Sequence, residues 1–121
     1  MFPRDLTTRE REVLIAMIEH GTELEVTITA EQRARWLAQV PYLRVMGRCQ
    51  CGTCPSIDLV SSVPVEDATS VVLHAASGQD GATGLGLLLF IREGALSSLE
   101  GYPVGEDAFD VFPPVSEMAF D

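Results

Sequence analysis

Near the start of the chain, apolar residues recur at helical spacing over residues 8–20. They form one stripe, made of Val13, Leu14, Met17 and Ile18. Charged residues occupy the other sides, so the pattern predicts an amphipathic helix that buries one face. Thr7 and Glu10 have the spacing of a capping box at its start, and Gly21 is placed to end it as a left-handed C-cap.

A second helix is predicted from Thr29 to Val40. Thr29 and Gln32 repeat the capping-box spacing, and the helix must end by Val40 because Pro41 disfavours helical backbone in the residue before it. The residues expected to face the core are Ala34, Trp36, Leu37 and Val40. We interpret Trp36, the single tryptophan, as a core anchor rather than a binding residue.

From Leu43 onward the apolar period changes to two, which is typical of strands. The predicted strands cover residues 43–49, 57–63, 70–76, 85–91 and 95–102. The nearly continuous apolar run of 85–91 favours a central strand covered on both faces, and Arg92-Glu93-Gly94 predicts a tight turn into the next strand. An alternation over residues 23–28 predicts one more strand between the helices, with an undetermined partner.

These elements predict the α+β class, with two N-terminal helices packed on an antiparallel sheet of four to six strands. The chain has 121 residues, of which 46% are hydrophobic, so we expect a single domain over residues 1–121. From about residue 103, three prolines and several acids predict a tail without regular elements. Within it, we expect Phe109 and Phe112 to pack back on the domain.

The net charge of −10 is unevenly distributed along the chain. Residues 1–50 carry seven arginines and seven acids, whereas residues 51–121 carry one arginine and eleven acids. An acidic surface repels phosphate, so we expect no nucleic acid and no membrane surface as a partner. The charge indicates either a basic protein partner or simple solubility. The candidate partner-binding residues are Glu106, Asp107 and Asp110 in the tail.

The chemistry of the chain concentrates in a CxCxxC segment formed by Cys49, Cys51 and Cys54. This spacing brings three sulfurs together, and zinc is the candidate cofactor because it prefers tetrahedral thiolate and imidazole ligands. A fourth ligand is needed, for which His74 is the main candidate and His20, a carboxylate such as Asp58, or water are alternatives.

Two other interpretations of the cysteines stay open. Cys51 and Cys54 form a CxxC unit, and the neighbouring Arg48 would lower a thiol pKa, as redox chemistry requires. Pro55 and a strand-like run follow, whereas a thioredoxin-like motif would open a helix. The third interpretation is three thiols in a tight turn. The N-terminus has no apolar signal core, which predicts a reducing cytoplasm.

The run LTTREREVLIAMIEHG over residues 6–21 resembles the opening helix of LuxR-type helix-turn-helix domains. That resemblance ends at Gly21, and the DNA-reading residues of the family have no matching positions here. The run GALSSLEGYPVGEDAFDVFPP over residues 94–114 resembles the terminal hairpin of small bacterial proteins, some of them immunity proteins encoded beside secreted toxins.

Two functions follow from these patterns. The first is a non-enzymatic interaction domain, of which an immunity-type inhibitor of a basic partner would be an example. The alternative is a small zinc- or thiol-dependent protein or enzyme that uses the CxCxxC segment. We assign no catalytic residue, because the sequence contains neither a nucleophile elbow nor a P-loop.

Overall fold

The computed structural model describes residues 3–23, 26–48, 56–62, 69–77, 85–103, 112–113 and 115–119. The helices in these ranges are α1 (Thr8–His20), α2 (Ala30–Gln39) and the 3₁₀ helices η1 (Val40–Tyr42) and η2 (Val115–Glu117). The strands are β1 (Leu43–Arg48), β2 (Ile57–Ser61), β3 (Val71–Ser77), β4 (Leu85–Arg92), β5 (Ala95–Pro103) and β6 (Met118–Ala119). The α+β class predicted from the sequence is confirmed.

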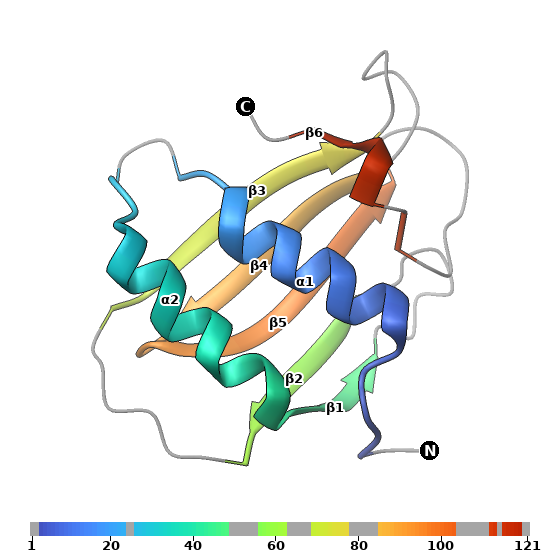
Figure 1. Cartoon of the computed structure of the whole chain (residues 1–121). Helices are drawn as coiled ribbons and strands as arrows, with labels where there is room; N and C mark the ends of the chain where they lie inside the picture. The colour runs from blue at the N-terminus through green and yellow to red at the C-terminus, as the bar shows by residue number, and fades with distance from the viewer. Residues whose placement is uncertain are drawn as a thin grey trace.

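The strands described form one antiparallel sheet in the order β1-β2-β5-β4-β3-β6. Five strands have at least five residues, and β6 adds a two-residue edge. Figure 1 shows both helices in front of the same face of this sheet, with α1 over β3 and β4, and α2 toward β5. The arrangement leaves the other face of the sheet without a helix in the described ranges.

The predicted hairpin between β4 and β5 is confirmed. Arg92 lies opposite Ala95, and the two residues between them, Glu93 and Gly94, both have positive φ. Two successive positive-φ residues make a turn whose twist matches that of the flanking strands. A bulge between Phe90 and Ile91 shifts the register, so that Leu96 and Leu99 both reach the buried face.

The capping box predicted at the start of α1 is present. The Thr7 hydroxyl accepts from the Glu10 amide, and the Glu10 carboxylate accepts from the Thr7 amide. The four apolar residues of the predicted stripe, Val13, Leu14, Met17 and Ile18, are all fully buried. This face supplies the helical side of the core.

The prediction for Gly21 was wrong in its mechanism. Its φ of −59° is an ordinary value, so the residue is not a left-handed cap. A Cβ at this position would lie 2.5 Å from the Met17 carbonyl oxygen and 2.9 Å from Leu73 Cβ. Glycine is therefore required here because the end of α1 approaches β3 closely.

The predicted capping box of α2 is also present, between Thr29 and Gln32. Trp36 is 1% exposed and belongs to the core, which confirms its interpretation as an anchor. Ala34, by contrast, was expected to face the core and is exposed. The buried residues of α2 are only Trp36 and Gln39, so this helix rests on the sheet by a narrow edge.

Two other expectations need correction. None of the described residues within 23–28 belongs to a strand; Thr22 instead makes a single bridge to His74, and Ile28 packs against the core while Val26 is exposed. The described residues between this bridge and α2 therefore do not extend it into a strand. The tail, expected to be irregular, contains η2 and β6, and β6 pairs with the end of β3.

Burial differs between the two sides of β4. Leu87, Leu89 and Ile91 face the core and are fully buried, whereas Leu88 and Phe90 on the other side are half-buried. The strand is central as predicted, but its two faces are not covered equally. Within the described residues, no helix is both long enough and apolar enough to cross a membrane.

Candidate functional site

Most of the residues predicted to carry chemistry lie outside the described ranges. These are Cys49, Cys51, Cys54, Glu106, Asp107 and Asp110. Among the main candidates only His74 is described, and of the alternative ligands His20 and Asp58 are described and exposed. The side chain of His74 is exposed on β3, and its backbone exchanges two hydrogen bonds with Thr22, of 2.9 and 3.2 Å.

The strands to which these segments connect end at one end of the sheet. Arg48 lies opposite Ile57, so the segment 49–55 joins two paired antiparallel strands. Ile57 lies opposite Leu99 of β5, which then runs on to Pro103, opposite Leu85 of β4. The segments 49–55, 78–84 and 104–111 therefore all connect to the sheet at the same end.

Two strands, β5 and β4, lie between β3, which carries His74, and β2, which borders the cysteine segment. His74, Leu88 and Glu100 lie in one row across β3, β4 and β5, at the level where Ser56 hydrogen-bonds to Gly101. β3 is three strand spacings from β2, which is about 14 Å. Asp58 of β2, opposite Gly47, is much nearer to the borders of the cysteine segment.

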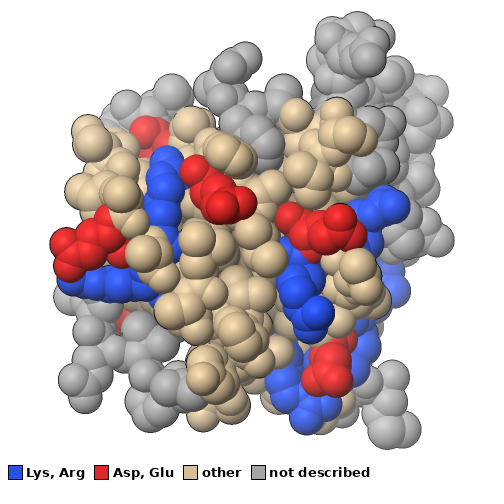
Figure 2. All heavy atoms as spheres, viewed as in Figure 1, with Lys and Arg blue, Asp and Glu red and all other residues tan. Residues whose placement is uncertain are grey.

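The charge is divided between the described core and the connecting segments. All eight arginines and ten of the eighteen acids lie in the described ranges, so these ranges carry a net charge of −2. The other eight acids, without any basic residue beside them, account for the remaining −8. On the helical face, blue and red side chains alternate around a central uncharged band (Figure 2).

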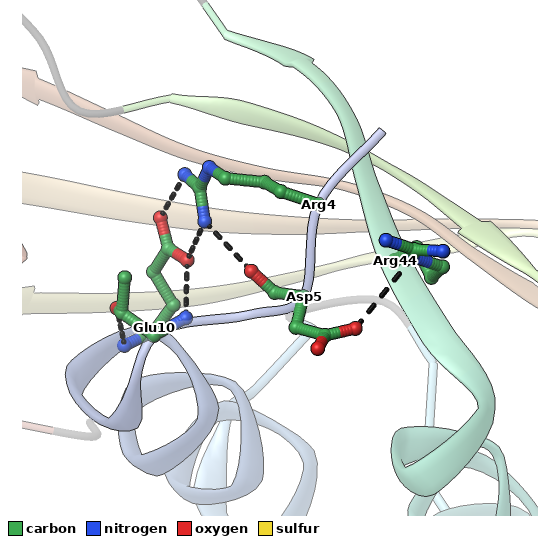
Figure 3. Close-up of polar contacts among 5 residues, drawn as sticks. Arg4, Asp5, Glu10 and Arg44 are labelled. Carbon is green, nitrogen blue, oxygen red and sulfur yellow. Dashed lines mark hydrogen bonds and ion pairs between the residues drawn. The ribbon is translucent and has the colours of Figure 1, made fainter. Parts of the chain in front are cut away.

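A polar cluster ties the N-terminal segment to α1 and β1 (Figure 3). Arg4 donates two hydrogen bonds of 2.8 Å to the Glu10 carboxylate, and its backbone bridges Val45. Arg44 lies 3.6 Å from Asp5 in the same cluster. Each of these contacts joins one structural element to another, which indicates a role in holding the fold.

Glu10 stays ionised although it is only 8% exposed. Burial by itself would raise the pKa of Glu10, but the hydrogen bonds from Arg4 and Thr7 outweigh that effect and lower the pKa below its ordinary value. The hydrogen bond to Glu10 likewise raises the pKa of Arg4. The pair is therefore charged at neutral pH.

Gln39 forms a second buried polar contact. Its side chain donates to the Gly94 carbonyl at 2.7 Å and accepts from the Leu96 amide at 3.1 Å. These backbone groups belong to the β4–β5 hairpin, so Gln39 fixes the end of α2 to the turn. Every buried side-chain polar atom in the described part of the chain has a hydrogen-bond partner.

A groove of about 470 Å³ lies between α1 and α2 and was not predicted from the sequence. We call it the interhelical groove; it is lined by Arg11, Ile15, Leu37, Val40 and Pro41. The signal for it was present in α2, where Ala34 and Leu37 lie outside the arc that Trp36 occupies. They were interpreted as part of the core because periodicity does not say how wide a buried face is.

The described residues include no cluster of three or more histidine, cysteine or acidic side chains that could hold a metal ion, and all three cysteines lie outside them. The structure thus brings together the ends of the chemistry-bearing segments, and the predicted zinc ligands Cys49, Cys51 and Cys54 lie outside the described residues. Compared with known proteins, the chain matches no family model, no curated protein and no solved structure.

Proposed function

We propose that this protein is a non-enzymatic interaction domain that binds a basic protein partner. The observation that carries the proposal is the division of charge: a nearly neutral framework and connecting segments that hold the acidic surplus. Four of the surplus acids, Asp80, Glu106, Asp107 and Asp110, belong to segments that connect at one end of the sheet. Like charges gathered in this way attract a basic surface.

The framework supports this function because three of its eight arginines are engaged in contacts that hold the fold. Arg4 binds Glu10, Arg9 donates to the Phe112 carbonyl at 2.9 Å, and Arg33 donates to the Ile18 carbonyl at 2.8 Å. Arginines held in such contacts are not available to neutralise the acids of the connecting segments. An immunity-type inhibitor, which the resemblance at residues 94–114 suggests, is one protein that would work in this way.

The test is a pull-down from the source cells at low salt, with identification of the captured protein and measurement of its affinity. We expect a basic protein that is released by about half-molar salt, because electrostatic association weakens as ions screen it. The variant Glu106→Gln/Asp107→Asn/Asp110→Asn should weaken binding by about tenfold or more.

The control variant removes the same number of negative charges, but from the helical layer. Glu12→Gln/Glu19→Gln/Glu31→Gln removes three exposed carboxylates from the helical layer. If the acidic connecting segments form the binding surface, this variant should keep an affinity within about twofold of that of the native protein. Equal weakening by both triple variants, or capture that is insensitive to salt, would refute the proposal.

A zinc- or thiol-dependent function is the second candidate, and one observation favours it. The segment 49–55 joins paired strands, so Arg48 and Ser56 hold its two ends close together, as a compact CxCxxC site requires. Metal analysis of protein purified without chelator should then find close to one zinc per chain. Cys51→Ser should abolish it and His74→Ala should retain it, since β3 is three strands away from β2. Less than a tenth of a zinc per chain would exclude this site.

A further inference from the structure

The face of α2 that borders the interhelical groove is apolar and open to solvent. Ala34, Ala38 and Pro41 are exposed, and Leu37 between them is half-buried. Their spacing of three and four residues places them on one stripe of the helix, separate from the arc that buries Trp36. Leu37 also packs against the core, whereas the two alanines of this stripe are exposed in the described part of the chain.

Among the described residues that line the groove, Arg11 of α1 is the charged one. It lies one helical turn before Ile15, so both line the same side of the groove. The Arg11 guanidinium is exposed and makes no hydrogen bond or ion pair with any described residue. A free guanidinium beside an apolar surface favours a ligand that combines apolar groups with a carboxylate.

The shape and backbone of the groove narrow the choice of ligand. Both walls are helices, whose backbone groups are already hydrogen-bonded, so an extended peptide would find no strand edge to pair with. A helix satisfies its own backbone and presents apolar side chains at a spacing that fits between two other helices. Exposed alanines at positions 34 and 38 allow such a helix to approach closely.

We propose that the interhelical groove binds an amphipathic helix of a partner protein, with an acidic residue at the edge of its apolar face that pairs with Arg11. This site lies on the helices, whereas the acidic residues of the first proposal belong to segments that connect strands. It selects a partner of opposite chemistry, so the two proposals can fail independently.

The probe is a fluorescently labelled 14-residue helical peptide of zero net charge, with leucines at positions i, i+4 and i+7 and one glutamate beside them. Fluorescence anisotropy should show saturable binding, and amide resonances of the ¹⁵N-labelled protein should shift around Ile15 and Leu37. Arg11→Gln should weaken binding by about tenfold, because a charge-assisted hydrogen bond is lost. Ala38→Glu should also weaken binding, because it places a charge on α2 next to Leu37, at the apolar wall of the groove.

Two matched controls make the test decisive. Arg92→Gln removes an exposed arginine from the end of β4 and should leave affinity unchanged. A peptide with lysine in place of its glutamate should bind about tenfold more weakly. The proposal is overturned if groove resonances do not shift, if Arg11→Gln and Arg92→Gln have the same effect, or if the two peptides bind equally.

Discussion

The two helices lie on the same face of one sheet but are held there in different ways. α1 buries a broad apolar face, with Val13, Leu14, Met17 and Ile18 all at 0% exposure. α2 buries only Trp36 and Gln39, one as a large apolar anchor and the other as a double hydrogen bond to the hairpin turn. Similar capping boxes begin both helices, so the caps do not account for this difference in burial. It lies in how much of each helix packs against the sheet.

This difference suggests a division of tasks between the helices. A helix that buries one broad face contributes mainly to the core. A helix that buries only two residues leaves most of its surface exposed, and the alanines of its apolar stripe are part of that exposed surface. The comparison predicts that α2 can be loosened without unfolding α1, whereas α1 cannot be loosened without also unfolding α2.

The largest expected effect is that of Trp36→Ala. Removing the main anchor of α2 should lower the free energy of unfolding by about 3–5 kcal/mol. Native-state hydrogen exchange should show protection lost first in α2, while the amides of α1 stay protected. Leu14→Ala is the control, because it should lower protection in both helices. Equal loss of protection in α1 and α2 for Trp36→Ala would contradict the comparison.

Gln39→Leu should have the next largest effect. The leucine keeps the volume but leaves the Gly94 carbonyl and the Leu96 amide buried without their partner. We expect the free energy of unfolding to fall by about 2–3 kcal/mol, measured by urea denaturation. Gln32→Leu, at a half-buried position in the same helix, should cost about 1 kcal/mol through the lost cap. The reverse order would show that the hairpin does not depend on Gln39.

Glu10→Ala tests how α1 is fixed to the N-terminal segment, with an expected loss of about 2 kcal/mol at pH 7. Because the pKa of Glu10 is lowered in the folded protein, its contribution is complete above its ordinary value of 4.5 and is lost as the pH falls through the folded value. The stability difference between native protein and variant should therefore shrink in acid. Glu31→Gln, at an exposed pair, should cost less than about 0.5 kcal/mol at any pH.

The smallest expected effect is that of Ala38→Glu. Because Ala38 is exposed on the free face of α2, the free energy of unfolding should change by less than about 0.5 kcal/mol. Thermal unfolding checks this value. A larger loss of stability would mean that the apolar stripe of α2 is covered within the folded chain, and the interhelical groove would then not be free for a partner.

Local features of this protein were determined by its sequence. Both capping boxes, the end of α2 before Pro41, and the turn at Glu93 and Gly94 depend on residues within four positions of one another. The alternation that predicted β1 and the apolar run that predicted β4 are local too. Such signals are legible in one chain because the interactions they describe are made within the segment itself.

The tertiary structure decided whatever depended on a distant neighbour. Gly21 is required partly by the nearby Met17 carbonyl and partly by the distant Leu73 of β3, and Ala34 is exposed because Trp36 places α2 on its edge. The strand order carries His74 three strands away from β2 while it gathers the ends of three connecting segments at one end of the sheet. Sequence spacing measures separation along the chain, whereas pairing and packing decide proximity in space, which is why the interhelical groove could not be predicted from the sequence.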